Sequence, residues 1–237
     1  MKPVKKTLRP KKKVILSMPP HWSYSRWQTY ETCPLKAKLS YIDMIRFEGG
    51  DRTAADRGTD IHKIAENCVL NSKAEIPPIL AHFATEIKSM RKLKAVVEMK
   101  LGLKRDWTPC DFDDPEYWWH GALDITAMLD DTHAFIADWK TGKIRESHAT
   151  QLELYALVVF LTDSDIEKVT VEDWYIDQKK KSTPVTYLRR QVPTLIKLWE
   201  RRVTPMFNDH TFPPCPNFLC GWCDYSKKNS DAGLCDY

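Results

Sequence analysis

The chain has 237 residues, of which 43% are hydrophobic and 29% are charged, as in ordinary globular proteins. This composition excludes a wholly disordered or fibrous chain, and the length fits one domain with small extensions. The 36 Lys and Arg residues exceed the 32 Asp and Glu residues by only four, which by itself is weak support for a nucleic-acid partner.

The first half of the chain is predicted to be mostly helical. Residues 1–20 form a basic arm without acidic residues, which fits a solvated tail and a phosphate-binding segment equally well. From Ser23, a good N-cap residue, apolar side chains recur at the spacing of one helix face. We expect a second helix over residues 53–70, and helical structure over 71–93 with a break at the Ile-Pro-Pro string.

The second half alternates strands and helices. A strand is predicted at 94–103, and 121–129 and 133–139 form the clearest hairpin, with its turn at 130–132. The remaining predicted elements are a helix, two strands and a helix, at 147–162, 168–177, 185–190 and 193–207. This order predicts an α/β or α+β fold with helices around a mixed central sheet. We divide the chain into a flexible arm (1–20), a main domain (21–210) and a Cys-rich tail (211–237).

Two carboxylates of the hairpin are expected to face each other. Asp124 lies seven residues before Asp131, the turn centre, and Asp138 lies seven after it. Because side chains alternate along a strand, Lys140 shares the face of both acids. Like charges about 5 Å apart need a cation, and carboxylate oxygens suit Mg²⁺ or Mn²⁺. The alternative is a surface hairpin with solvated acids, although both strands are apolar on both faces.

Two further residues could join these acids. Glu98 lies among apolar residues of the strand at 94–103, and His62 ends the string RGTDIH of the second helix. A lone strand Glu usually faces solvent, and a lone His is usually structural. Neither residue therefore indicates a metal site without the hairpin.

Five strings taken together resemble the RecB-like PD-(D/E)XK nucleases. They are RGTDIH (57–62), VEMKL (97–101), GALDI (121–125), DWKTGK (138–143) and QLELYA (151–156). In that family a strand carrying Asp precedes a strand carrying Asp-x-Lys, and a helix with Gln-x-x-x-Tyr follows. The resemblance spans roughly residues 24–160 and implies a restriction-endonuclease-like core.

The resemblance also implies metal ligands. His62, Asp124 and Asp138 would bind a catalytic Mg²⁺ or Mn²⁺, and the backbone carbonyl of Trp139 would complete the coordination. Glu98 would be an outer group or a ligand of a second metal.

The resemblance also implies catalytic residues. Lys140 would orient or activate the water that attacks phosphorus in line. Gln151 and Tyr155, four residues apart and so on one helix face, would lie over the scissile phosphate. The candidates for further DNA contact are Arg57, Lys143 and Trp119.

The seven cysteines indicate metal binding more than disulfides. Four of them lie in the tail: Cys215, Cys220, Cys223 and Cys235. The Cys-Gly-Trp-Cys string has the form of a redox dithiol, while zinc held by four thiolates and an iron–sulfur cluster are the other interpretations. The ligand type alone does not separate zinc from iron.

A subgroup of the RecB-like nucleases, including the CRISPR-associated and AddB-type enzymes, has one cysteine before the nuclease motifs and three after them, which hold a 4Fe–4S cluster. The string Tyr30-Glu31-Thr32-Cys33-Pro34 is similar to the leading string of that subgroup. The resemblance implies Cys33, Cys220, Cys223 and Cys235 as ligands, with Cys215 as the substitute for Cys235. The cluster would connect the N-terminal helix to the tail.

The function implied is a metal-dependent exonuclease that hydrolyses DNA at its ends, in recombination, replication or end processing. The expected partner is DNA with single-stranded ends, while the sequence does not separate single- from double-strand preference. No G-x-x-x-x-G-K-S/T string is present, so unwinding would need a helicase or recombination partner. The alternatives are a CRISPR spacer-processing nuclease, a non-catalytic DNA-binding scaffold of the same fold, and a thiol redox or zinc-binding interaction protein.

The sequence also predicts where the protein is found. No apolar run reaches the roughly 18 residues of a membrane helix, and no apolar segment like that of a secretory signal follows the basic start. We expect a cytoplasmic protein without a membrane partner, in the host cytoplasm if the source is viral.

Overall fold

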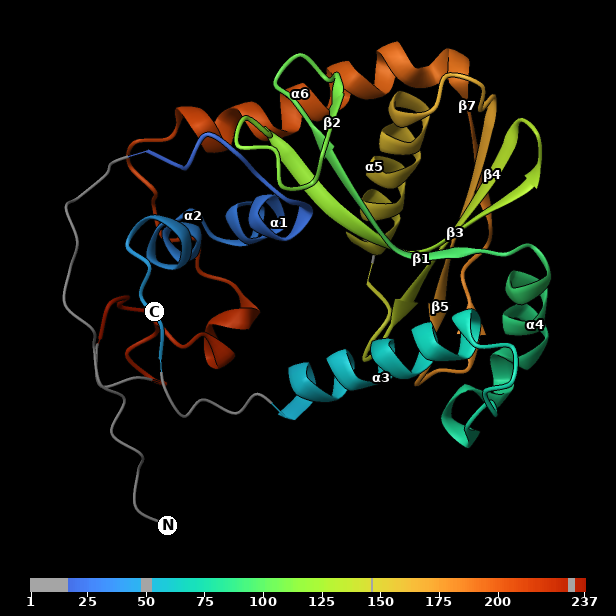
Figure 1. The fold of residues 1–237 in the computed structure, drawn as a ribbon. Helices are drawn as coiled ribbons and strands as arrows, with labels where there is room; N and C mark the ends of the chain where they lie inside the picture. Colours follow the sequence, from blue (N-terminus) through green and yellow to red (C-terminus); the bar gives the residue numbers. More distant parts are fainter. Residues whose placement is uncertain (1–16, 48–52, 146, 230–232) are drawn as a thin grey trace. The chain divides into compact units, whose positions relative to one another are not determined.

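The computed structural model describes residues 17–47, 53–145, 147–229 and 233–237 (Figure 1). The chain forms two compact units: residues 53–199, and residues 1–52 together with 200–237. The predicted borders after residues 20 and 210 do not coincide with this division and stay predictions. Most of the predicted basic arm lies outside the described residues.

In the described part of the chain, seven strands form one mixed sheet in the larger unit. They are β1 (Val96–Leu103), β2 (Pro109–Cys110), β3 (Trp119–Asp130), β4 (His133–Lys140), β5 (Lys168–Tyr175), β6 (Lys180–Lys181) and β7 (Val185–Leu188). Their order is β2-β1-β3-β4-β5-β6, with β7 also paired to β5. Only β4 and β5 are parallel among these pairs. The predicted mixed sheet flanked by helices is confirmed.

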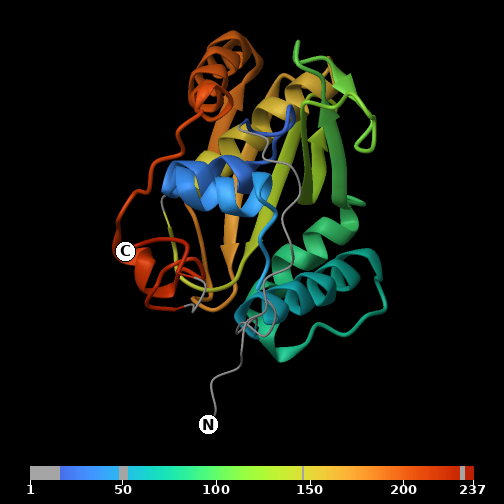
Figure 2. The same ribbon diagram turned by 90° about the vertical axis from the view of Figure 1, so that its left-hand side faces the viewer.

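Helices cover both faces of this sheet. They are α3 (Thr53–Leu70), the 3-10 helix η2 (Pro78–Phe83), α4 (Ala84–Lys92) and α5 (Ser147–Thr162). The short 3-10 helix η3 (Arg189–Gln191) follows β7, and α6 (Val192–Asn208) begins in this unit and ends in the smaller one. Helix α5 supplies the crossover that the parallel pair β4 and β5 requires, and it packs against β5 (Figure 1). Helices α3 and α4 lie side by side (Figure 2).

An aromatic core fills the space between the sheet and α3, η2 and α4. The Phe83 ring stacks on Trp174 at 5.8 Å between centroids and meets Trp139 edge-on at 5.7 Å. Ile125 and Ala137 belong to the same buried cluster. Because side chains alternate along strands, the residues between these positions are directed to the opposite face, which α5 covers. The alternation thereby separates this core from Asp124, Asp138 and Lys140.

The predicted hairpin register is confirmed. Ile125 pairs with Ala137 and Met128 pairs with Ala134, as expected for pairing symmetric about residue 131. The turn is slightly tighter than predicted, since β3 extends to Asp130. The Asp130 carboxylate accepts a hydrogen bond from the Thr132 amide at 2.9 Å, which closes the turn.

The smaller unit begins with the predicted helix after Ser23. Its elements are α1 (Tyr24–Thr32), α2 (Pro34–Ala37), the π-helix η1 (Lys38–Ile42), the end of α6 and the 3-10 helix η4 (Phe218–Trp222). The Ser23 hydroxyl caps α1 by accepting from the Arg26 amide at 3.4 Å. The Tyr30 hydroxyl donates to Asp209 at 2.9 Å, so side-chain bonds connect the N-terminal helix to the last part of the chain.

Two sequence predictions are corrected in detail. Residues 71–77 are not helical, because consecutive prolines at 77 and 78 delay the next helical turn. The predicted strand at 185–190 ends at Leu188, where a 3-10 turn begins.

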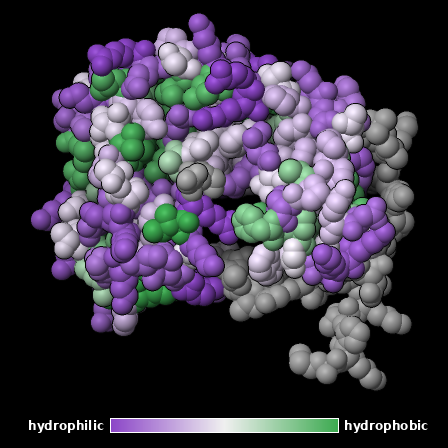
Figure 3. Space-filling model, turned by 180° about the vertical axis from the view of Figure 1, so that it is seen from behind, coloured by the Kyte–Doolittle hydropathy of each residue, from purple (hydrophilic) through white to green (hydrophobic). Residues whose placement is uncertain are grey.

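Among the described residues, no helix is long and apolar enough to cross a membrane. The face drawn in Figure 3 is mainly hydrophilic, with hydrophobic residues in separate spots.

Candidate active site

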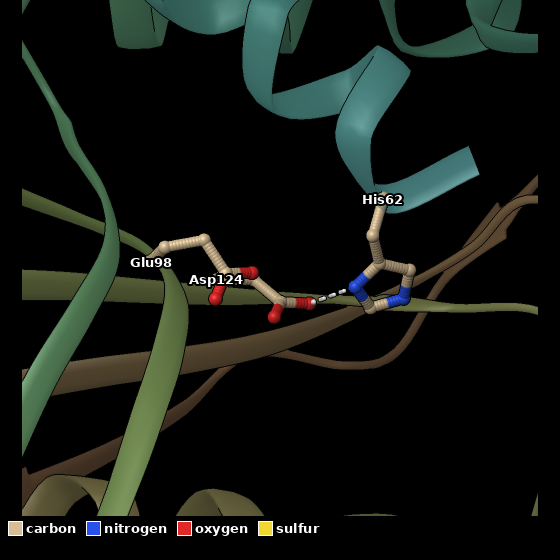
Figure 4. A group of neighbouring side chains, drawn as sticks. All are labelled: His62, Glu98 and Asp124. Carbon is tan, nitrogen blue, oxygen red and sulfur yellow. Dashed lines mark ion pairs between the residues drawn. The ribbon is translucent and has the colours of Figure 1, made fainter. Parts of the chain in front are cut away.

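Three side chains from three elements of the larger unit converge (Figure 4). His62 of α3, Glu98 of β1 and Asp124 of β3 each offer one ligand atom, and these atoms lie within 4.8 Å of one another. Nδ1 of His62 is 3.3 Å from Oδ2 of Asp124. One imidazole nitrogen and carboxylate oxygens form a donor set that fits a divalent cation such as Mn²⁺ or Mg²⁺.

The sheet register places Glu98 in this group. Val97 pairs with Ile125 and Met99 pairs with Leu123, so Glu98 lies opposite Asp124. Its backbone φ is +48°, in the left-handed region that costs a non-glycine residue about 1–2 kcal/mol. Strained backbone inside a regular strand is characteristic of functional positions, and it marks Glu98 as more than a solvent-facing strand residue.

A backbone amide fixes the Asp124 carboxylate. The N–H of Trp139 donates to Oδ2 of Asp124 at 2.8 Å, the oxygen that also faces His62. The Trp139 side chain is buried in the core, so this amide cannot move far. The expected use of the Trp139 carbonyl as a metal ligand stays a prediction.

Asp138 starts a chain of polar contacts that ends on α5. Its carboxylate lies 2.5 Å from the Lys140 ammonium, which donates to Oε1 of Gln151 at 2.7 Å. Nε2 of Gln151 donates in turn to the Tyr155 hydroxyl at 2.6 Å. The structure thus brings together the residues that the resemblance had implied for catalysis. Asp138 itself faces Lys140 and does not belong to the group around His62.

The site carries more negative charge than its environment favours. Burial and the nearby Asp124 charge, offset in part by Lys140, raise the pKa of Asp138 to about 7. Burial and Asp124 also raise the pKa of Glu98. Burial lowers the pKa of His62, but its hydrogen bond to Asp124 and the charge of that acid outweigh burial and raise it. A divalent cation would relieve the excess charge that these protons otherwise neutralise.

Residues 21–227 match the model of the PD-(D/E)XK nuclease superfamily. The chain belongs to this superfamily. A candidate exonuclease from Eubacterium rectale has a similar fold, with a TM-score of 0.53, 11% identity, and 89% of this chain and 88% of that chain covered. The protein SSO0001 follows with a TM-score of 0.38, 14% identity, and coverage of 87% and 84%. No curated protein matches the chain.

The DNA-contact candidates of this PD-(D/E)XK nuclease occupy different environments. Arg57 forms an ion pair with Asp177, with its two nitrogens 3.1 and 2.5 Å from the carboxylate oxygens. Lys143 is exposed and follows Gly142, whose φ of +85° suits glycine. Trp119 is completely buried, so its ring packs in the core and is not accessible to a nucleobase.

Asp177 is a residue of the nuclease site that the sequence did not reveal. Besides pairing with Arg57 of α3, its carboxylate accepts from the Gly142 amide at 2.7 Å. It therefore connects the helix that carries His62 to the loop after Lys140. The segment around Asp177 has no motif, and its role depends on contacts between elements distant in sequence, so no signal could have found it.

An open cavity is lined by two of the three candidate ligands, His62 and Glu98. Besides His62 and Glu98, it is lined by Gly58, Thr59, Lys63, Glu66, Lys100 and Thr141. Two of these side chains are lysines, which suit a phosphate-bearing substrate. The cavity gives the candidate metal site access to solvent.

The cysteines of the smaller unit gather around a separate pocket. All five that the sequence singled out line it: Cys33, Cys215, Cys220, Cys223 and Cys235. The Cys215 amide donates to the Cys33 sulfur at 3.4 Å, and the Asn217 amide donates to the Cys220 sulfur at 3.3 Å. Within the described residues, no three cysteine sulfurs lie within 4.8 Å of one another.

Proposed function

We propose that the protein is a metal-dependent deoxyribonuclease that hydrolyses phosphodiester bonds at DNA ends. The observation that carries this proposal is the convergence of His62, Glu98 and Asp124 within 4.8 Å. Beside them, Lys140 is fixed between Asp138 and Gln151. Membership of the PD-(D/E)XK nuclease superfamily supports the same chemistry.

The residues of the candidate site have separate proposed roles in metal binding and in orienting water. A bound Mg²⁺ or Mn²⁺ supplies Lewis acidity, which lowers the pKa of water and neutralises phosphate charge. His62, Asp124 and Asp138 are the proposed ligands, with Glu98 as a fourth. Lys140 keeps its charge close to the reacting phosphate and orients water for in-line attack.

An exonuclease acting on single-stranded ends is the form we favour. The similar fold of the candidate exonuclease from Eubacterium rectale supports the exonuclease part of this proposal. A helicase or recombination partner would supply such ends. A CRISPR spacer-processing role has no specific observation in its favour.

The direct test is cleavage of end-labelled single- and double-stranded DNA, with Mg²⁺, Mn²⁺ or EDTA, by protein purified anaerobically. A circular substrate that survives while linear DNA is degraded supports an exonuclease. Asp138→Ala and Lys140→Ala should abolish cleavage. The matched control is Asp131→Asn, because this acid lies exposed in the turn of the same hairpin. Degradation of DNA by purified Asp138→Ala protein would refute the proposal.

We further propose that the cysteine pocket holds a structural 4Fe–4S cluster bound by Cys33, Cys220, Cys223 and Cys235, with Cys215 as the substitute for Cys235. The N–H donors to two sulfurs support thiolate ligands. Four thiolates also suit a single zinc ion, so the metal content of the purified protein decides between the two.

The cluster is tested by metal analysis rather than by activity. We expect four iron atoms per chain, a brown colour, and loss of both in Cys33→Ser. Cys68→Ser is the control, since that buried thiol belongs to the larger unit. Colourless protein with one zinc ion per chain would overturn iron in favour of zinc.

A further inference from the structure

A second buried carboxylate lies beside the candidate catalytic residues and has no place in the proposed mechanism. Asp173 of β5 is 2% exposed and is the direct neighbour of Asp138 in the parallel pair of strands. Neighbouring strands lie about 4.8 Å apart, and paired residues share a face. The two acids are therefore adjacent on the face covered by α5.

One oxygen of Asp173 is bonded and the other is not. Oδ2 accepts a hydrogen bond from the Tyr175 hydroxyl at 3.2 Å. Among the described residues, Oδ1 is fully buried and has no hydrogen-bond partner. A buried oxygen left unpaired costs about 1–3 kcal/mol, and more when it is charged. An unpaired buried oxygen of this kind calls for an explanation, and one explanation is a partner that it gains in another state of the protein.

The surroundings of Asp173 lead to the catalytic lysine. Lys140 pairs directly with Tyr175 on the neighbouring strand, so Asp173 is diagonal to it on the same face. The Tyr175 hydroxyl also lies 3.3 Å from Nδ1 of His148. His148 precedes Gln151 by one helical turn of α5, and Gln151 accepts from Lys140. Asp173 and Tyr175 thus lie beside Lys140 on the neighbouring strand, and Tyr175 also contacts the helix that carries Gln151, the partner of Lys140.

We propose that Asp173 is a positioning residue for Lys140. This inference rests on the proposed nuclease function. In the structure the Lys140 ammonium is paired with Asp138. Once Asp138 turns its oxygens to a cation, Lys140 loses that counter-charge. The unpaired Oδ1 of Asp173 then receives the ammonium and keeps it directed at the substrate.

The chain offers a matched control in the preceding residue. Glu172 is also buried, at 5% exposure, but it lies on the opposite face of β5. There it pairs with Lys181 at 3.6 Å. Glu172→Gln therefore removes a buried acid from the same strand without altering the Lys140 surroundings.

The experiment compares Asp173→Asn, Tyr175→Phe and Glu172→Gln in steady-state cleavage of DNA with Mn²⁺. We expect Asp173→Asn to lower kcat by about 10–100-fold, as when a supporting group is removed, with KM and Ca²⁺-supported DNA binding unchanged. Tyr175→Phe should give a smaller loss, and Glu172→Gln should leave kcat within about twofold. If Asp173→Asn does not fold, Tyr175→Phe carries the comparison.

A second readout does not depend on cleavage. The rate at which an acetylating reagent modifies Lys140 is measured by mass spectrometry in saturating Ca²⁺. We expect this rate to rise severalfold in Asp173→Asn or Tyr175→Phe and to stay unchanged in Glu172→Gln. Wild-type protein that does not cut DNA would refute the proposed function. Wild-type cleavage with an unchanged kcat in the Asp173 variant, or equal losses in the Glu172 control, would refute the positioning role alone.

Discussion

Replacing Asp138 by asparagine should stabilise the metal-free protein at neutral pH while it abolishes cleavage. The side chain is 3% exposed, and its pKa is raised from 3.8 to about 7 by burial and by Asp124. This raised pKa already includes the favourable contact with Lys140. Asparagine cannot ionise, so the variant removes a net penalty on the order of a few kcal/mol from the folded state at neutral pH.

The stability difference between Asp138→Asn and the wild type should depend on pH in a defined direction. A carboxyl whose pKa is higher in the folded state binds more protons when folded, so its contribution to the free energy of unfolding falls as pH rises from about 4 to about 7. Above that range the full penalty is present. Asparagine does not titrate, so the difference between Asp138→Asn and wild type should be near zero at about pH 4 and largest at about pH 8.

The assay is urea unfolding in EDTA across this pH range, with Asp131→Asn as the exposed control. Mn²⁺ at about 100 times its Kd should add about 2.7 kcal/mol to the wild type and much less to Asp138→Asn. A metal-free Asp138→Asn protein that is less stable than wild type at high pH would refute the reasoning. It would mean that Lys140 compensates fully for the buried charge.

Three other variants test neighbouring parts of the structure. Arg189 donates to the carbonyls of Phe160, in the last turn of α5, and of Asp163 and Ile166, which follow it. Arg189→Met should therefore cost about 2–4 kcal/mol in urea unfolding, whereas Arg190→Met at an exposed position should cost under about 0.5 kcal/mol. Glu98→Gln should weaken Mn²⁺ binding about 10–100-fold by calorimetric titration with an unchanged circular dichroism spectrum; unchanged affinity would remove Glu98 from the ligand set. Gly142→Ala, at φ +85°, should lower stability by about 1–2 kcal/mol in thermal unfolding, and no loss would contradict the left-handed turn.

Local patterns predicted the elements near the site well. The hairpin was readable because a short polar turn separates two apolar runs, and its symmetry about Asp131 determined the pairing of Ile125 with Ala137. Helix α3 matched its predicted bounds, Thr53–Leu70. Lys140 and Gln151 were proposed from the family resemblance, but the hydrogen bond between them was not predicted.

Contacts between distant segments were beyond the sequence. The strained backbone of Glu98 depends on how β1 lies against β3, which no local pattern reports. Trp119 illustrates the opposite error, because an aromatic residue near a site can serve the core as well as the substrate, and burial alone decides between them. Asp173 belongs to no motif, and only its pairing with Asp138 of β4 places it beside the candidate site.

Arg57, one of the DNA-contact candidates, helps to hold the helix that carries His62, because its guanidinium is paired with Asp177. Arg57 reaches Asp177, which also accepts from the Gly142 amide, so α3 and the loop after Lys140 share one carboxylate. A Cβ on Gly58 would lie 3.2 Å from Oγ1 of Thr141, which shows how closely the two segments approach. An Arg57 that turned to a phosphate would give up this connection and loosen His62 relative to β4. The positive charge of Arg57 therefore serves to hold His62 in position relative to β4 before it can serve to bind a phosphate.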